Sequence, residues 1–340
     1  MAEPHTLLYD QALPADAVPP ELALSLVIPV FNEAGSLPVL FARLAEVLAA
    51  GPARYAESYE VVLVDDGSTD ESFRLCAEQQ RRDEHLKVVR FRRNFGKTAA
   101  LRAGFSLSHG RYVVTLDADV QEDPADMFGM LDQLDTGYDL VSGWREQRND
   151  PLTKTLPSRI FNSVVGLATG LSLRDFNCGF KAYRREVVDN LRLYGELHRF
   201  IPVLAHQQGF RVTELPVHHQ ARRFGKSKFG AGRLVSGYLD LIQVLFLVSF
   251  LRRPFRLFGF IGSLLVGLGT LALGYLTVLW FLGDRPIGNR PLLTLGMLLV
   301  LVGLQFFSTG LIAEMLRNLN YRPGDDYSIA EIAGLPKDTR

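Results

Sequence analysis

The sequence contains very little cysteine. Cys76 and Cys178 are its two cysteines among 340 residues, and they lie far apart, without the paired spacing of a metal-binding motif. Two such thiols do not build the disulfide framework that stabilises small secreted domains. The cysteine content therefore argues against a disulfide-rich extracellular protein and fits a reducing compartment.

An excess of either charge is also absent. Lys and Arg together number 37, as do Asp and Glu, so the formal net charge is zero. Nucleic-acid binders normally carry a basic surplus, so this balance argues against a nucleic-acid partner. Residues 1–22 are rich in Pro and Ala and lack a basic start followed by an apolar run. They predict a flexible lead segment and no signal peptide.

Long apolar runs are present, and both lie after residue 235. Residues 257–282 and 292–312 carry no charge, and each run exceeds the roughly 20 residues that a helix needs to cross a bilayer core. Pro286 and Gly288 break the short connection between them. One alternative is a buried hairpin in a soluble protein, but two such runs in succession favour a transmembrane hairpin over residues 257–313.

Basic residues flank this hairpin, and they are Arg252, Arg253 and Arg256 before it and Arg317 and Arg322 after it. Positive flanks favour the cytoplasm. We therefore expect a multi-pass protein of the plasma (inner) membrane, with the domain before the hairpin and the tail, residues 314–340, on the cytoplasmic side. The apolar segment at residues 233–256 predicts an interfacial helix. Residues 160–171 fit either a second interfacial helix or one packed on the domain.

Residues 23–232 alternate between short apolar runs and helical patterns. Strands are expected at residues 24–30, 61–64, 88–91, 112–116 and 139–142, and helices at residues 37–48 and 97–107. Strands that are apolar throughout and separated by helices predict a mostly parallel, Rossmann-like α/β sheet covered on both faces. Ligands bind such sheets beyond the carboxyl ends of the strands, so the motifs at those ends are the candidate site.

Polar motifs follow the first two strands. Asn32 and Glu33 come after the first, where Asn32 is either a turn residue or a partner for a base or ribose. Asp65 and Asp66 end the second strand. Two adjacent carboxylates after a buried strand are costly unless something uses them, so this pair favours a functional role.

The strongest motif follows the fourth strand and reads Asp117-Ala118-Asp119-Val120-Gln121. A turn can aim both carboxylates at one point, and with the carbonyl oxygen of Gln121 they offer the hard ligands that Mg²⁺ or Mn²⁺ prefer. The alternative is an acidic surface turn. The position after a buried strand, third in a series of polar motifs at strand ends, favours a metal that also binds diphosphate.

Two basic segments complete the set. Residues 92–97 follow the third strand at a helix start, where they either meet phosphate or stay solvated. Residues 222–228 lie just before the membrane segment and suit a lipid phosphate or the donor diphosphate. Their alternative is a juxtamembrane basic patch, but the Phe, Gly and Ser among the charges favour a specific loop.

In this order, the motifs VIPVFNE, VDDGSTD, RNFGK, DADVQ, NCGFKAYRR and RFGKSKFG resemble family 2 glycosyltransferases with a GT-A fold. More narrowly, they look like polyprenyl-phosphate glycosyltransferases, among them dolichol-phosphate mannose synthases, and the tail hairpin is similar to a bacterial undecaprenyl-phosphate subgroup. The resemblance implies inverting transfer of a hexose, glucose first, to a polyprenyl phosphate. The donor would be a UDP-sugar, with GDP-mannose as the alternative.

The resemblance also implies roles for single residues. Those for nucleotide-sugar binding are Pro29, Asn32, Glu33, Asp65, Asp66, Asp117 and Arg145. Those for the metal are Asp117, Asp119 and Gln121, those for the acceptor phosphate are Arg159, Ser163, Arg222 and Lys228, and the catalytic set is Asp119, Arg159, Arg222 and Lys228. Glu196, His198 and Arg199 fall in the acceptor-side segment without an assigned role.

Two other functions fit parts of the pattern. A processive polysaccharide synthase of the same fold would carry a Gln-x-x-Arg-Trp motif, which this sequence lacks. A non-catalytic membrane scaffold would have lost the metal carboxylates, which are present. Five glycines in the first apolar run, Gly259, Gly262, Gly267, Gly269 and Gly274, predict close helix packing and a homo-oligomer.

Overall fold

The computed structural model describes residues 22–145, 165–166, 169–195, 197–220, 254–283 and 288–319. The chain divides into two compact units, one formed by residues 1–166 and 171–230 and the other by residues 167–170 and 231–340. The predicted lead segment, the two predicted interfacial helices and the tail fall largely outside the described residues, so they and the predicted domain boundaries stay predictions.

A seven-stranded sheet forms the centre of the first unit, in the order β3-β2-β1-β4-β6-β5-β7. The strands are β1 (Leu24–Val30), β2 (Tyr59–Asp65), β3 (Leu86–Arg90), β4 (Tyr112–Thr115), β5 (Leu140–Arg145), β6 (Lys181–Arg184) and β7 (Val212–Val217). β6 runs antiparallel to both neighbours, and every other pairing is parallel. The expected mostly parallel sheet is therefore confirmed.

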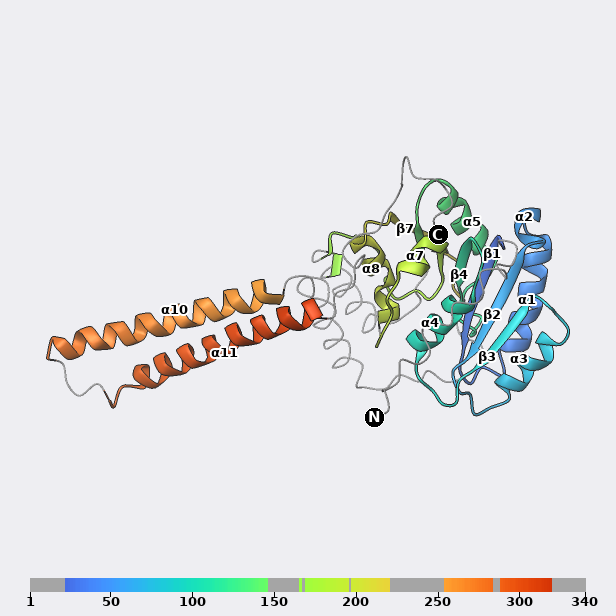
Figure 1. Cartoon of the computed structure of the whole chain (residues 1–340). Helices are drawn as coiled ribbons and strands as arrows, with labels where there is room; N and C mark the ends of the chain where they lie inside the picture. Colours follow the sequence, from blue (N-terminus) through green and yellow to red (C-terminus); the bar gives the residue numbers. More distant parts are fainter. Residues whose placement is uncertain are drawn as a thin grey trace, which may run out of the picture. The chain divides into compact units, whose positions relative to one another are not determined.

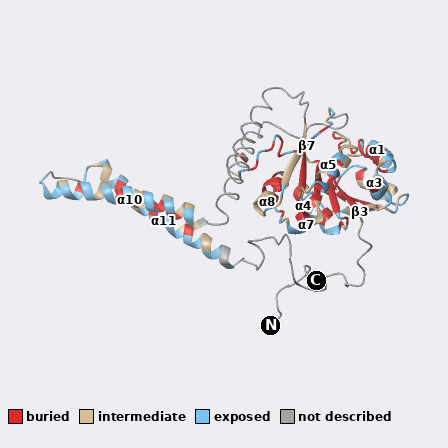
Figure 2. Ribbon diagram, turned by 90° about the horizontal axis from the view of Figure 1, so that it is seen from above, coloured by how far each residue is buried: buried red, intermediate tan, exposed pale blue. Residues whose placement is uncertain are grey.

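Helices cover both faces of the sheet (Figure 1). They are α1 (Leu37–Ala50), α2 (Ala53–Ala56), α3 (Ser72–Gln80), α4 (Lys97–Leu107), α5 (Asp126–Asp135), α7 (Arg185–Asn190), α8 (Ile201–Gln207) and the 3-10 helix η2 (Leu197–Phe200). Apolar side chains of α1 and α5 share one core with Leu26 and Ile28 of β1. α4 packs on the opposite face, where Gly104 lies against Val27. Within the first unit, the buried residues of Figure 2 lie in the sheet and on the inner sides of these helices.

β6 was not expected from the sequence. Its four residues carry Lys181 and Arg184, so the run shows no apolar pattern. Tertiary pairing forms the strand, because it hydrogen-bonds to β4 on one side and to β5 on the other. β6 thus joins the parallel half of the sheet to β5 and β7, which carry Arg145 and residues 212–217.

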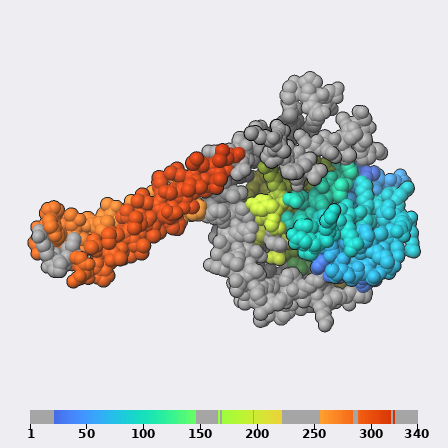
Figure 3. Space-filling view, turned by 60° about the horizontal axis from the view of Figure 1, so that its bottom comes forward, coloured from blue at the N-terminus to red at the C-terminus, as the bar shows by residue number. Residues whose placement is uncertain are grey.

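Two long helices, α10 (Pro254–Phe281) and α11 (Pro291–Leu319), form the second unit. Both are long and apolar enough to cross a membrane, and they pack side by side along their length (Figure 3). A Cβ added to Gly262 would lie 2.7 Å from the carbonyl oxygen of Gly303, and one added to Gly269 would lie 2.7 Å from that of Gly296. These glycines therefore pack the hairpin itself, and the predicted homo-oligomer stays a prediction.

Candidate active site

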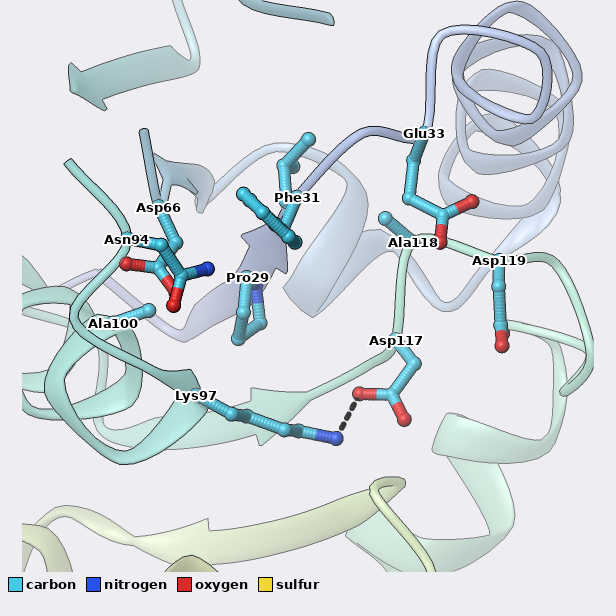
Figure 4. Close-up of a pocket in the computed structure, with 11 residues that line it drawn as sticks. Pro29, Phe31, Glu33, Asp66, Asn94, Lys97, Ala100, Asp117, Ala118 and Asp119 are labelled. Atoms are coloured by element: carbon cyan, nitrogen blue, oxygen red, sulfur yellow. Dashed lines mark hydrogen bonds and ion pairs between the residues drawn. The ribbon is translucent and has the colours of Figure 1, made fainter. Parts of the chain in front are cut away.

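A pocket of about 280 Å³ opens at the carboxyl ends of β1, β2 and β4. It is lined by Pro29, Val30, Phe31, Glu33, Asp66, Asn94, Lys97, Ala100, Asp117, Ala118 and Asp119 (Figure 4). These residues come from the end of β1, from the loops after β1, β2, β3 and β4 and from the start of α4, so the sheet gathers segments that lie up to 90 positions apart. The pocket has the position that ligands take in open α/β sheets.

The loops after β1 and β2 are tied together at the rim of this pocket. The Oδ1 atom of Asn32 accepts a hydrogen bond of 2.8 Å from the backbone N–H of Thr69, and the Asn32 N–H donates to Ser68. Asn32 also adopts a positive φ of 55°, a conformation that Asn tolerates better than most residues. The structure gives Asn32 the turn role, and it does not line the pocket.

The two acids after β2 have different surroundings. Asp65 is fully buried, accepts from the N–H of Ser68 and lies 3.4 Å from Arg90, so it holds its own loop and does not reach the pocket. Asp66 lines the pocket, and its carboxylate accepts the backbone N–H groups of Phe95 and Gly96 at 2.7 and 2.9 Å. Burial raises the pKa of Asp66 despite these two hydrogen bonds. Asp66 therefore fixes the loop that precedes α4.

Asp117 forms an ion pair with Lys97, the first residue of α4, across the floor of the pocket (Figure 4). Burial alone would raise the pKa of Asp117, but the Lys97 ammonium outweighs it and lowers that pKa. The Asp117 carboxylate also lies against Gly179, where an added Cβ would come within 2.5 Å of it. A larger residue at position 179 would displace Asp117, which explains the glycine of the NCGF motif.

The loop after Asp117 is strained. Val120 adopts a positive φ of 57°, which is a rare conformation for a β-branched side chain. Such strain persists where surrounding contacts impose it, and it concentrates at functional sites. Here it follows Asp119, which lines the pocket, and precedes Gln121, which does not. The amide nitrogen of Gln121 donates to the carbonyl oxygen of Gln220 at 3.4 Å.

Residues 218–220 fasten the end of β7 to this strained loop. The N–H of Gln220 donates to the carbonyl oxygen of Gln121 at 2.7 Å, and His219 forms an isolated antiparallel bridge with Glu122. The Nδ1 atom of His219 lies 3.5 Å from Glu122, which is buried. These contacts position the chain two residues before Arg222. The sequence motifs gave no sign of Glu122 or His219, because their pairing depends on the fold.

His198 of η2 also lies near the site. Its Nδ1 atom is 2.8 Å from the hydroxyl of Thr98, the residue after Lys97. Burial, with the positive charges of Lys97 and Arg199, lowers the pKa of His198 to about 3. The imidazole is therefore neutral at physiological pH, and it joins the segment that was left unassigned to the start of α4.

The remaining predicted site residues fall elsewhere. Arg145, at the end of β5, forms an ion pair of 2.8 Å with Asp175 and does not line the pocket. The predicted residues Arg159, Ser163, Glu196, Arg222 and Lys228 lie outside the described residues. Of the nucleotide set, the structure brings Pro29, Glu33, Asp66 and Asp117 together, and Lys97 joins them as a residue that the sequence left undecided.

The carboxylates fit a divalent cation that keeps other ligands. Within the described ranges, no three His, Cys, Asp or Glu side chains are grouped as a complete metal cage. Asp117 and Asp119 nevertheless border the same pocket, and Mg²⁺ is usually held by one or two carboxylates together with water and substrate phosphates. The donor set therefore suits a metal that arrives with a phosphate ligand.

Comparison with known proteins agrees with this geometry. The family model of glycosyl transferase family 2 matches residues 25–192. A dodecaprenyl-phosphate galacturonate synthase of Rhizobium johnstonii is 39% identical over 312 residues, covering 90% of each chain. An undecaprenyl-phosphate 4-deoxy-4-formamido-L-arabinose transferase of Yersinia enterocolitica is 34% identical over 315 residues, covering 92% of this chain and 94% of that protein.

The fold also matches solved structures. The crystal structure of glucosyl-3-phosphoglycerate synthase from Mycobacterium tuberculosis in complex with Mg²⁺ and UDP superposes with a TM-score of 0.51 at 19% identity. The match covers 67% of this chain and 79% of that one. At this identity the likeness concerns the fold alone, and it supports the GT-A architecture of the first unit.

Proposed function

The chain belongs to glycosyl transferase family 2, and we propose that this glycosyltransferase moves a sugar from a nucleotide-sugar to the phosphate of a polyprenyl lipid. The observation that carries the proposal is the pocket in which Asp66, Asp117, Asp119 and Lys97 meet at the strand ends. That pocket offers separate groups for a nucleotide, for a metal and for phosphate.

The relatives support the lipid acceptor. Their names carry dodecaprenyl phosphate and undecaprenyl phosphate as acceptors, and this chain matches them over nine-tenths of its length. Their sugars are galacturonate in one case and 4-deoxy-4-formamido-L-arabinose in the other. Glucose from UDP-glucose stays our first prediction from the motifs, and the two relatives supply the sugars against which it has to be tested.

The pocket residues divide the work of donor binding. Asp66 and the loop that it holds form the nucleotide side, and Pro29 and Phe31 offer apolar surface for a base. A divalent metal would be held by Asp117 and Asp119 and would supply positive charge against the diphosphate leaving group. Gln121, the third predicted ligand, does not line the pocket here, and its side-chain amide bonds to Gln220. The mycobacterial enzyme of the same fold was crystallised with Mg²⁺ and UDP, which supports a divalent metal in general.

The acceptor phosphate reduces the need for a general base. Its second pKa is about 6, so the group is largely ionised near neutral pH. We therefore propose a single in-line displacement with inversion at the anomeric carbon, driven by positioning and charge stabilisation. Arg222 and Lys228 remain the proposed phosphate ligands. The bonds of Gln220 and His219 to the Asp119 loop support this, because they fasten the chain close to where that basic segment begins.

We further propose that α10 and α11 cross the inner membrane, with the catalytic unit on the cytoplasmic side, where nucleotide-sugars are made. Each helix is about as long as a bilayer core requires, and most of its surface is exposed. This exposure fits lipid contact, since a hairpin in a soluble core would be buried. The arginines on either side of the hairpin favour the same orientation.

The deciding experiment is a donor panel with the full chain in detergent. UDP-glucose, UDP-galacturonate, UDP-4-deoxy-4-formamido-L-arabinose and GDP-mannose are each incubated with a short polyprenyl phosphate, and the lipid product is measured by mass spectrometry. One donor should give a singly glycosylated lipid, and chelation should stop the reaction until Mg²⁺ or Mn²⁺ is restored. The matching polyprenol without phosphate is the control.

Three results would contradict the proposal. The absence of product from every donor would argue for a scaffold. A polymeric product would support a processive synthase. Equal use of the unphosphorylated polyprenol would remove the lipid phosphate as the nucleophile. Arg222→Ala and Lys228→Ala enzymes test the phosphate ligands, since normal turnover in both would assign that role elsewhere.

A further inference from the structure

The part of the pocket that the structure describes is strongly acidic, and Lys97 is the one cation among its described lining residues. Among the described residues that line it, Glu33, Asp66, Asp117 and Asp119 carry carboxylates, and Lys97 alone carries a positive charge. The Lys97 ammonium pairs directly with an oxygen of Asp117. Among the described lining residues, therefore, Lys97 supplies the positive charge that pairs with Asp117.

This ion pair competes with the metal. Asp117 belongs to the proposed metal set, and one of its two oxygens is already bonded to an ammonium group. A cation that approaches without a nucleotide has to separate Lys97 from the Asp117 carboxylate to which its ammonium is hydrogen-bonded. Each side chain of the pair keeps 31% of its surface exposed, so the pair is about two-thirds buried, and breaking a partly buried ion pair in this way costs free energy. The free enzyme is therefore poorly prepared to bind the metal alone.

A nucleotide diphosphate removes this cost. Lysine carries three donors on a flexible four-carbon stem and binds phosphate as a point charge. Lys97 is also the first residue of α4, an eleven-residue helix, and the free N–H groups and dipole at a helix start favour an anion beside it. An incoming diphosphate therefore offers Lys97 a second anion close to the one that it gives up.

We propose that Lys97 is a resident counterion that moves from Asp117 to a phosphate oxygen of the donor when metal and nucleotide bind together. The inference rests on the proposed donor site. The exchange has a thermodynamic consequence, because a group that must move when either ligand binds couples the affinities of the two ligands. This coupling is the same in both directions. Nucleotide should tighten metal binding, metal should tighten nucleotide binding, and part of that coupling should belong to Lys97.

Calorimetry of Mn²⁺ binding, with and without saturating UDP, tests the exchange on the full chain in detergent. We expect UDP to tighten Mn²⁺ binding by more than roughly tenfold in the unmodified protein, within the usual range of coupling between sites. Lys97→Met should bind Mn²⁺ alone several-fold more tightly and lose most of the coupling. Lys97→Arg, which keeps the charge, should retain both properties.

Lys87→Met is the matched control. Lys87 also pairs with a carboxylate, that of Glu60, but at the other end of the sheet, and its loss should leave Mn²⁺ binding unchanged. A Lys97→Met protein that binds Mn²⁺ more tightly by the same factor with and without UDP would show simple charge repulsion and would overturn the exchange. An unchanged coupling factor would overturn it as well.

The outcomes separate this inference from the proposed function. Binding of both Mn²⁺ and UDP with coupling that ignores Lys97 would remove the exchange and leave the donor site standing. Failure of the unmodified protein to bind either ligand would remove the donor site, and the exchange with it. If Lys97→Met folds poorly, Lys97→Arg is compared with the unmodified protein. Because arginine keeps the positive charge, loss of the coupling between Mn²⁺ and UDP in Lys97→Arg would contradict a role that depends on that charge.

Discussion

The two ends of the sheet each hold a carboxylate beside a lysine, and the two arrangements differ. At the amino end, Glu60 accepts hydrogen bonds from the Ser25 hydroxyl, the Lys87 ammonium and the backbone N–H of His109, and 3% of it is exposed. At the carboxyl end, Asp117 pairs with Lys97, and its side chain keeps 31% of its surface exposed to a pocket.

The difference separates a structural charge from a functional one. Glu60 is closed in by neutral and positive donors from β1, β3 and the loop before β4, and these outweigh burial and lower its pKa. The carboxyl end instead keeps four carboxylates around an open cavity. Among the described residues other than glycine, positive φ occurs at Asn32 and Val120, both in loops at this end. Backbone strain and the cluster of carboxylates therefore occur together at the carboxyl end of the sheet, where a bound ligand would offset their cost.

The largest effect on turnover should come from a substitution at the carboxyl end of the sheet. Asp119→Ala removes a carboxylate of the metal set, so turnover should fall by about a thousandfold, the upper range for loss of one charge-stabilising group. Asp119 lies in a loop at the pocket, so the thermal midpoint of the protein should change little. Product formation and thermal unfolding, measured on the same preparation, check both statements. Near-normal turnover would remove Asp119 from the metal site.

A substitution at the amino end of the sheet should lower stability and leave turnover nearly unchanged. Glu60→Ala leaves the Ser25 hydroxyl and the His109 N–H without their buried acceptor, which should cost about 2–3 kcal/mol of unfolding free energy. The kcat of the protein that remains folded should stay within about twofold, because a group at the amino end does not touch the donor. Chemical denaturation and steady-state kinetics give the two numbers. A large fall in kcat with unchanged stability would contradict the division between the ends.

Part of this comparison could be read from the sequence. The sequence patterns predicted β1 and α4 with their observed bounds, residues 24–30 and 97–107, because a buried strand leaves a continuous apolar run and an amphipathic helix leaves a periodic one. The motif after the fourth strand placed Asp117 and Asp119 at the pocket. Such local signals suffice for elements and for the acidic loops.

The rest depends on contacts between distant segments. The sequence left Lys97 undecided between phosphate ligand and surface charge, since its partner Asp117 lies 20 positions away. Gly179 supports that carboxylate from a segment 62 positions further on, and Lys181 sits in a strand that pairing alone creates. Asp65 and Asn32 show the reverse case, because residues predicted to bind the nucleotide are engaged in holding their loops.

A smaller effect should follow from weakening the contact between the end of β7 and the Asp119 loop, at the carboxyl end of the sheet. Glu122→Gln weakens the tie to His219, and we expect kcat to fall by about tenfold, as for groups that orient metal ligands. UDP affinity should stay unchanged, since Glu122 does not line the pocket. The control is His218→Asn, which removes the exposed contact to Asp126 next to it. A parallel loss of thermal stability and activity would indicate a merely structural tie.

The smallest effect should be a difference in pH dependence. His198 has a folded pKa of about 3, against 6.5 for an unperturbed histidine. Below pH 6.5 the unfolded chain takes up a proton that the folded chain refuses, so stability falls as the pH decreases from 7.5 to 5.5, by up to about 1 kcal/mol per unit. His198→Gln removes this contribution and keeps a hydrogen-bonding group for Thr98. The fall in thermal midpoint over that range should shrink by about 4 °C.

His109→Gln is the matched control for this last measurement, because it removes a histidine beside Glu60 at the amino end. An identical fall in midpoint for His198→Gln and the unmodified protein would mean that the His198 imidazole is hydrated, and η2 would then not be packed on α4 as it is here. If the fall in thermal midpoint is reduced in His198→Gln alone, the contact between His198 and Thr98 is shielded from water at neutral pH. The start of α4, and with it Lys97, would then be supported by η2 through His198.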